Sequence, residues 1–94
     1  MALMNNLQTR EKAEILALEA LTWLAGDEES LQRFLDQSGT DAAVLKATAG
    51  SPETQIAVLD FLLANEDLLL RFCENAAIEP RFVHLAHHHL GGAA

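Results

Sequence analysis

Four histidines near the carboxyl end, His84, His87, His88 and His89, are the residues of this sequence best suited to chemistry. On an α-helix, residues three or four positions apart share a face, so His84 would lie beside His87 and His88. Imidazoles placed in this way can chelate a divalent ion, and a zinc site would need a further carboxylate ligand from elsewhere in the chain. The spacing therefore indicates a candidate metal site at His84, His87 and His88. The alternative is a solvated final helical turn whose imidazoles are favoured by the helix dipole.

The apolar residues of the same segment predict the direction in which these imidazoles point. Phe82, Val83, Ala86 and Leu90 would form the buried side of the helix. A helix of this kind buries one apolar stripe and leaves its polar side in water. We therefore expect all three candidate ligands to be exposed.

No other residues form a recognisable catalytic arrangement. Cys73 is the only cysteine, which excludes an intrachain disulfide, fits a reducing compartment and predicts a small buried apolar residue. Asp60 could be a buried acid with a perturbed pKa, but we expect it on a polar strip of its helix beside Glu53. No nucleophile stands in order with a base, and no glycine-rich loop could hold a phosphate. We predict that the protein is not an enzyme and has no cofactor.

The charge balance argues against nucleic acids and membranes as partners. Asp and Glu number 14 against six Lys and Arg, which gives a net charge of −8. Binding to nucleic acid or to anionic lipid relies on clustered basic side chains, and the six here are scattered. Much of the acidity has a local cause, because carboxylates cap helices and meet the positive end of the helix dipole. Such positions account for Asp27, Glu28, Glu29, Asp41, Glu53, Glu66, Asp67 and Glu79.

The sequence carries no signal for export or membrane insertion. Its start lacks the basic and long apolar regions of a signal peptide. No apolar run approaches the ~20 residues that span a bilayer. We therefore expect a cytoplasmic protein.

The composition and the helix start and stop signals predict an all-α fold. Half of the residues are hydrophobic but only five are aromatic, so helix-forming Leu and Ala dominate. Start signals such as Asp27, Asp41 and Ser51-Pro52 and stop signals such as Gly26 divide the chain into short helices with tight connections. The predicted helices span about 9–25, with Thr9 as the cap, 28–37, 41–49, 52–64, 66–76 and 79–90. Together they form one domain, 9–91, between disordered ends at 1–8 and 92–94.

The predicted helices occur as two similar sets. An ungapped shift of 38 residues superimposes the halves 10–49 and 52–90, so that caps, aromatic residues and charges coincide. Trp23, for example, falls on Phe61. We therefore predict a compact six-helix bundle made of two pseudo-repeated three-helix units. An armadillo-like solenoid has a similar unit, but two repeats are too few for it.

The longest helix of each half is apolar around most of its circumference. Helices of this kind are buried. We therefore expect the helices at 9–25 and 52–64 to cross at the centre of the bundle. Trp23 and Phe61 would hold equivalent places in the core.

One difference between the halves suggests an interface. The fifth helix has Leu68 and Leu70 where the second has Ser30 and Gln32. Either the fifth helix is more enclosed, which is the commoner cause, or Leu68 and Leu70 contact a partner protein or a second subunit.

Two arginines have acidic neighbours three residues along their helices. We expect Arg33 to pair with Asp36, and Arg71 with Glu74. Pairs of this spacing stabilise a helix by only about 0.2–0.5 kcal/mol. They therefore indicate no function.

Motifs between Leu21 and Val83 resemble an uncharacterised family of small helical bacterial proteins, a domain of unknown function. They are Trp23-Leu24-Ala25-Gly26-Asp27-Glu28, Arg33-Phe34-Leu35 and the run from Val58 to Leu70. The family pattern has glycine, a hydrophobic residue, an acid and proline between the last two helices of each half. This sequence departs from it at Ala77, Thr40 and Ala42. The resemblance implies a helical fold in a bacterial protein and brings no activity, ligand or catalytic residue.

Together these features predict a non-enzymatic helical module that binds an unknown protein partner or a second copy of itself. The alternative is a metal- or pH-responsive accessory protein that uses the C-terminal histidines. The first rests on the broad apolar helices, and the second on the imidazole spacing.

Overall fold

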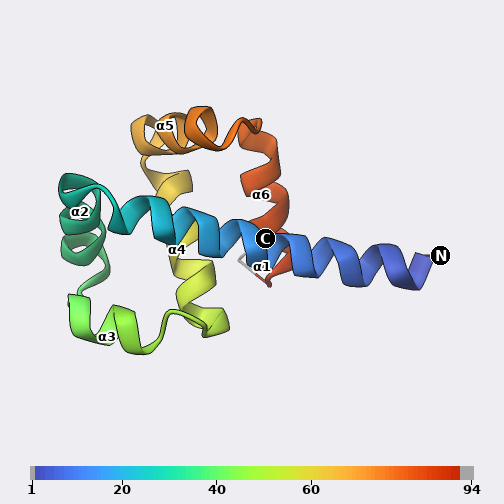
Figure 1. Ribbon diagram of the computed structural model, residues 1–94, viewed down its shortest axis with the longest axis horizontal. Helices are drawn as coiled ribbons and strands as arrows, with labels where there is room; N and C mark the ends of the chain where they lie inside the picture. Colours follow the sequence, from blue (N-terminus) through green and yellow to red (C-terminus); the bar gives the residue numbers. More distant parts are fainter. Residues whose placement is uncertain (1, 92–94) are drawn as a thin grey trace.

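A computed structural model of the protein describes the backbone of residues 2–91 and the side chains of residues 10–91. Within residues 2–91 the fold is all-α, with no strand, as predicted. The helices are α1 (Ala2–Ala25), α2 (Glu28–Ser38), α3 (Ala42–Ala47), α4 (Pro52–Ala64), α5 (Glu66–Ala76) and α6 (Pro80–His89) (Figure 1). The Cα radius of gyration is 12.9 Å, close to the ~12 Å of a globular chain of this length.

Three helix starts follow directly from local side-chain chemistry. Asp27, Asp41 and Ser51 each accept a hydrogen bond from the backbone N–H three residues later. This bond satisfies one of the donors that the first helical turn leaves without a partner. The predicted capping signals at these positions are confirmed.

Two helix boundaries differ from the sequence prediction. Helix α1 begins at Ala2, ahead of the expected cap at Thr9, and so includes most of the segment 1–8 that we expected to precede it. No glycine or proline interrupts the chain before Gly26, so nothing in this segment stops a helix. Helix α3 ends at Ala47, two residues earlier than expected. The predicted tail, 92–94, lies outside the residues that the structure describes.

Helix α4 lies at the centre of the fold. It passes behind α1 in Figure 1, and both helices contact α6. The largest apolar side chains that are almost wholly buried come from α1, α4, α5 and α6 and include Leu24, Leu59, Leu62, Phe72 and Val83. One core therefore joins the two halves of the chain.

The prediction that α1 is buried around most of its circumference is wrong. Its buried stripe is narrow and made of Ala13, Ala17, Ala20 and Leu24. Trp23 is only partly buried, whereas Phe61 belongs to the core. The small alanines allow α1 to pack closely on α4 and α6, which leaves the apolar residues on its other side uncovered.

The predicted ion pairs within α2 and α5 are also wrong. Arg33 Nη1 lies 3.0 Å from Asp67 Oδ2, and Arg71 Nη2 lies 3.9 Å from Asp27 Oδ2. The fold brings the start of each helix beside the middle of the other, so the long arginine side chains reach across. Asp36 instead accepts a hydrogen bond from Gln32.

Candidate interaction surface

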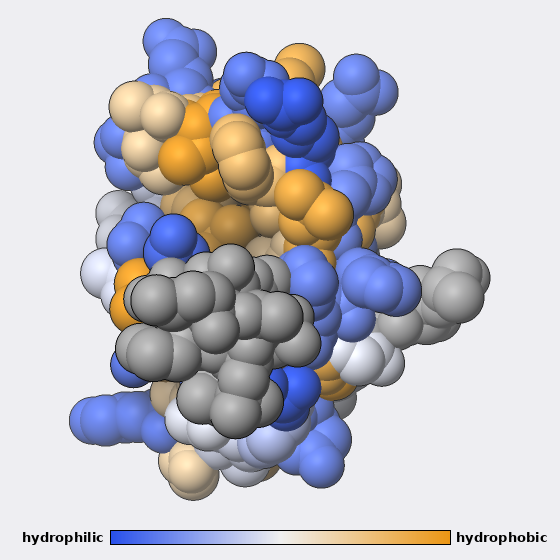
Figure 2. All heavy atoms as spheres, turned by 90° about the vertical axis from the view of Figure 1, so that its right-hand side faces the viewer, coloured by the Kyte–Doolittle hydropathy of each residue, from blue (hydrophilic) through white to orange (hydrophobic). Residues whose placement is uncertain are grey.

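Exposed apolar side chains gather on one side of α1. Six large hydrophobic side chains within residues 10–91 are exposed, and four of them line two adjoining grooves. These four are Ile15, Leu18, Phe82 and Leu85. In Figure 2, apolar atoms surround a hollow in the upper half of the molecule. We call these four residues and the two grooves the apolar face.

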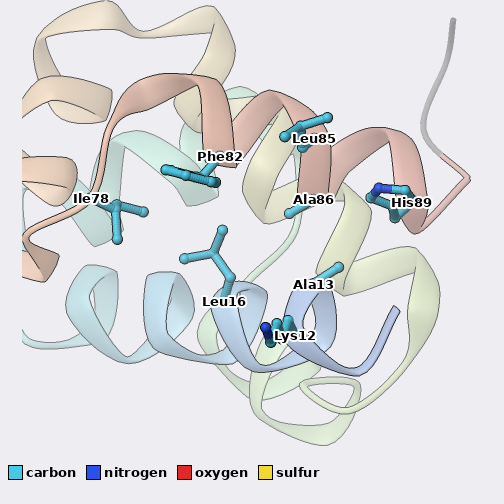
Figure 3. A pocket seen from close by; sticks show the side chains of 8 residues that line it. All are labelled: Lys12, Ala13, Leu16, Ile78, Phe82, Leu85, Ala86 and His89. Atoms are coloured by element: carbon cyan, nitrogen blue, oxygen red, sulfur yellow. The ribbon is translucent and has the colours of Figure 1, made fainter. Parts of the chain in front are cut away.

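The first groove lies between α1 and α6 and has a volume of about 340 Å³. In Figure 3, Leu16 points from α1 toward Ile78 and Phe82, Lys12 lies beside Leu16 on α1, and His89 lies at the end away from Ile78. Ala13, Leu85 and Ala86 complete the lining. Six of the eight lining residues are therefore apolar, which suits the burial of apolar side chains.

The second groove lies between α1 and α5 and has a volume of about 500 Å³. Its walls include Ile15, Leu18 and Trp23 from α1 and Phe72 from α5. Trp23 and Phe72 are in contact, with ring centroids 5.9 Å apart. Glu19 is the charged residue of its lining. This groove therefore continues the apolar surface along α1.

Helix geometry explains why the two grooves adjoin. One stripe of α1 carries four residues at spacings of four, three and four: Lys12, Leu16, Glu19 and Trp23. The first two line the groove toward α6, and the last two line the groove toward α5. The two grooves thus follow one another along this side of α1, with Glu19 between Leu16 and Trp23.

Lys12 lines the α1–α6 groove, and two arginines contact other residues of its lining. Arg10 Nη1 donates a hydrogen bond to the carbonyl oxygen of His89 at 3.1 Å, which ties α1 to the end of α6. The Arg81 guanidinium lies 5.2 Å from the centroid of the Phe82 ring, and its Nε is 3.0 Å from Glu79. With Lys12, these are three of the six basic residues of the chain.

The structure separates the three candidate metal ligands. His84 and His88 are exposed, as predicted, but His87 is buried, with 11% of its side chain exposed. His87 Nε2 lies 3.4 Å from Oδ1 of Asp60, whose side chain is 72% exposed. The prediction that all three imidazoles point to water is therefore wrong for His87, and the expectation of an exposed Asp60 is confirmed.

The spacing of apolar residues on α6 explains this difference. Val83, Ala86, His87 and Leu90 are three, one and three residues apart and form the buried stripe, while Phe82 is exposed. The sequence prediction placed Phe82 on the buried side because it treated histidine as polar. The three-and-four-residue spacing from Val83 was the signal that could have identified His87 as buried.

The proposed metal site gains no further ligand from the fold. No three His, Cys, Asp or Glu side chains within residues 10–91 are grouped so that they could hold a metal ion. His84 and His88 remain four residues apart on the exposed side of α6. Metal binding by this pair stays a prediction.

The predicted interface at Leu68 and Leu70 is not formed by both residues. Leu68 is 1% exposed and lies in the core, whereas Leu70 is 49% exposed. Residues two positions apart point about 200° apart on a helix, so they cannot share one face. Enclosure accounts for Leu68, and Leu70 lies outside the two grooves.

Cys73 is buried, as expected. Desolvation by burial raises the pKa of its thiol. A thiol in this setting is less often ionised at neutral pH and is a poor nucleophile.

Comparison with known protein families places the whole apolar face within one domain. A family model described as "Protein of unknown function (DUF3572)" matches residues 10–93. The chain belongs to the DUF3572 family. The predicted resemblance to an uncharacterised helical family is thereby confirmed. The DUF3572 match includes every residue of the apolar face, and no curated protein or solved structure matches the chain.

No helix within residues 2–91 combines the length and the apolar character that a membrane span needs.

Proposed function

We propose that this DUF3572 domain is a non-enzymatic protein-interaction module that binds its partner through the apolar face. The observation that carries the proposal is the gathering of Ile15, Leu18, Phe82 and Leu85 around two adjoining grooves. Exposed apolar residues are ordinarily scattered singly over a monomer, whereas a contiguous patch with polar edges marks an interaction site.

The sequence of α1 supports this interpretation. The core uses the stripe from Ala13 to Leu24, with Leu16, Leu21 and Trp23 packed against it. Ile15 and Leu18 do not belong to this packing and are exposed. Burying an apolar surface stabilises a complex by roughly 25 cal/mol per Å². The large side chains on the outer side of α1 therefore favour binding, although they add little to the stability of the free domain.

We also infer that the halves 10–49 and 52–90 are two copies of one three-helix unit. Helices α2 (Glu28–Ser38) and α5 (Glu66–Ala76) have equal lengths and are offset by 38 residues. The aromatic contacts are reciprocal under the same shift: Trp23 contacts Phe72, and Phe61 contacts Phe34 at a centroid distance of 5.1 Å. Arg33 and Arg71 also correspond under this shift, and each reaches an aspartate at the start of the other helix, although the two aspartates, Asp67 and Asp27, do not fall on one another.

The inferred repeat allows the α1–α6 groove to be compared with the groove at the equivalent place in the first half. A groove between α3 and α4 occupies the equivalent place in the first half. Under the shift of 38, its residues Thr40, Val44, Thr48 and Thr54 correspond to Ile78, Phe82, Ala86 and Leu16. Three threonines thus stand where the α1–α6 groove has apolar residues. The three-helix unit does not require an apolar groove at this place, which supports a binding role for the α1–α6 groove.

Site-specific photocross-linking in the cells that naturally make the protein tests the proposal. A photoreactive amino acid at Leu85 should cross-link to a defined protein, while the same group at the exposed Gln32 of α2 should not. Ile78→Thr, which introduces the residue of the equivalent groove, should weaken the Leu85 cross-link. Equal products from Leu85 and Gln32, or none from Leu85, would overturn the proposal.

A further inference from the structure

We propose that the partner at the apolar face is a second copy of this chain, with the two α1 helices packed antiparallel. This inference rests on the proposed function and names its partner. It is carried by the arrangement of apolar and charged residues on the outer side of α1.

The outer side of α1 carries four residues at the spacing of a coiled-coil seam, and the central two, Ile15 and Leu18, are apolar. Glu11, Ile15, Leu18 and Thr22 are spaced four, three and four residues apart and are all exposed. They lie opposite the buried stripe that holds α1 on the core. Ile15 and Leu18 are the apolar centre of this seam, with 50% and 44% of their surfaces exposed.

Charged residues beside the seam select the antiparallel direction. Lys12 and Glu19 are both exposed and flank the seam on the same edge, since Lys12 lies three residues before Ile15 and Glu19 directly follows Leu18. In an antiparallel pair this edge meets its own copy, so Lys12 lies opposite Glu19 of the second copy when Ile15 lies opposite Leu18 of the second copy. The two-fold axis repeats this contact, which gives two ion pairs.

A parallel pair would lack this complementarity. It would bring one edge of α1 against the opposite edge of the second copy. Glu14, on the other edge, would then approach Glu19 of the second copy, and like charges at this position repel. The charges of α1 therefore favour one of the two possible directions.

The helix pair also brings the α6 side of the apolar face into the interface. The edge with Lys12 and Glu19 borders both grooves. A second copy that approaches along this edge covers Leu16 and the neighbouring Phe82. Stable interfaces bury at least about 1,000 Å² in total, more than Ile15 and Leu18 supply alone. Contact with α6 is therefore part of the proposal.

Sedimentation velocity of the full chain over a concentration series tests the arrangement through charge exchange. The wild type should form a dimer. Lys12→Glu and Glu19→Lys should each weaken dimerisation by roughly tenfold, because each places like charges opposite one another in both contacts. The double variant K12E/E19K should restore the wild-type dimer. Leu18→Ser should remove it, and Phe82→Ser should weaken it.

The substituted side chains are all exposed, so circular dichroism should show the same helix content in every variant. If both single variants lose dimerisation and the double variant does not restore it, the antiparallel arrangement is overturned. A monomeric wild type at all concentrations would overturn the second copy as partner. If Leu85 nevertheless cross-links to a different protein, the proposed function stands while this inference fails. Cross-links between two copies of the chain support both the proposed function and this inference.

Discussion

Arg33 and Asp67 join the two halves of the protein across 34 residues of sequence. Arg33 Nη1 donates to both carboxylate oxygens of Asp67, at 3.1 and 3.0 Å. Arg33 belongs to the middle of α2, and Asp67 to the first turn of α5. The contact therefore reports whether these helices keep their positions relative to one another.

Replacing Asp67 with asparagine should lower stability slightly at neutral pH and not at all in strong acid. The hydrogen bond from Arg33 is the main cause that holds the pKa of Asp67 below its ordinary value of 3.8. Because the folded pKa is lower than the unfolded one, the carboxylate stabilises the fold fully above the unfolded pKa. This contribution is lost as the pH falls through the folded pKa.

Thermal unfolding across this pH range measures the effect. The small difference in melting temperature between wild type and Asp67→Asn should be present at pH 7 and should vanish well below pH 3.8. Asp36→Asn is the matched control, because Asp36 accepts a hydrogen bond from Gln32 of its own helix and has no arginine partner in the structure's ion pairs. A difference that persists unchanged in acid would show that the ion pair does not cause it.

Leu68 and Leu70 should respond very differently to truncation. Leu68→Ala removes a core side chain and should cost about 2–5 kcal/mol of unfolding free energy, through lost burial and the cavity left behind. Leu70→Ala changes an exposed position and should stay within about 0.5 kcal/mol of wild type. Urea denaturation followed by circular dichroism measures both. Equal losses would contradict the inward orientation of Leu68.

The two leucines also show how far the sequence predicts this fold. Helix starts at Asp27, Asp41 and Ser51 depend on hydrogen bonds within one turn, so sequence patterns identify them. The burial of Leu68 also has a local signal, because Leu68, Leu69, Phe72 and Cys73 recur at helical spacing and form the buried side of α5. A comparison of single positions between the two halves does not carry this signal.

The candidate site was harder to predict, because it depends on how the helices pack against one another. Ile15 and Leu18 look like core residues in a sequence, because the pattern of α1 does not show how narrow its packed stripe is. That width follows from close packing of Ala13, Ala17 and Ala20 against other helices. Asp60 could not be matched with His87 in advance, because α4 and α6 meet only in the folded chain.

Zinc should not stabilise the protein at micromolar concentration. His87 turns inward toward Asp60, which leaves His84 and His88 as the exposed pair of the three candidates. Two imidazoles are fewer ligands than structural or catalytic zinc sites use. Thermal unfolding and calorimetry of tag-free protein with and without zinc measure this. A zinc-dependent rise in melting temperature that His84→Ala abolishes would instead favour the metal-responsive alternative.

Ala77→Gly should stabilise the protein. Ala77 ends α5 with a φ angle of 57°, in the left-handed region where an L side chain crowds its own backbone. The helix end needs this conformation, because the next N–H, that of Ile78, turns back to donate to the carbonyl of Cys73 at 3.0 Å. Glycine adopts the same conformation without the steric cost, so the unfolding free energy should rise by about 0.5–1 kcal/mol, after the greater entropy of the unfolded glycine chain is deducted.

Gly39→Ala is the matched control at the end of α2. Gly39 has a φ angle of 74°, and a Cβ atom added there would meet nothing within 4 Å, so the substitution introduces backbone strain alone. It should lower the unfolding free energy by about 1 kcal/mol, opposite in sign to Ala77→Gly. Urea denaturation of both variants gives the two values directly. Destabilisation by Ala77→Gly would mean that α5 does not end in the left-handed conformation in solution.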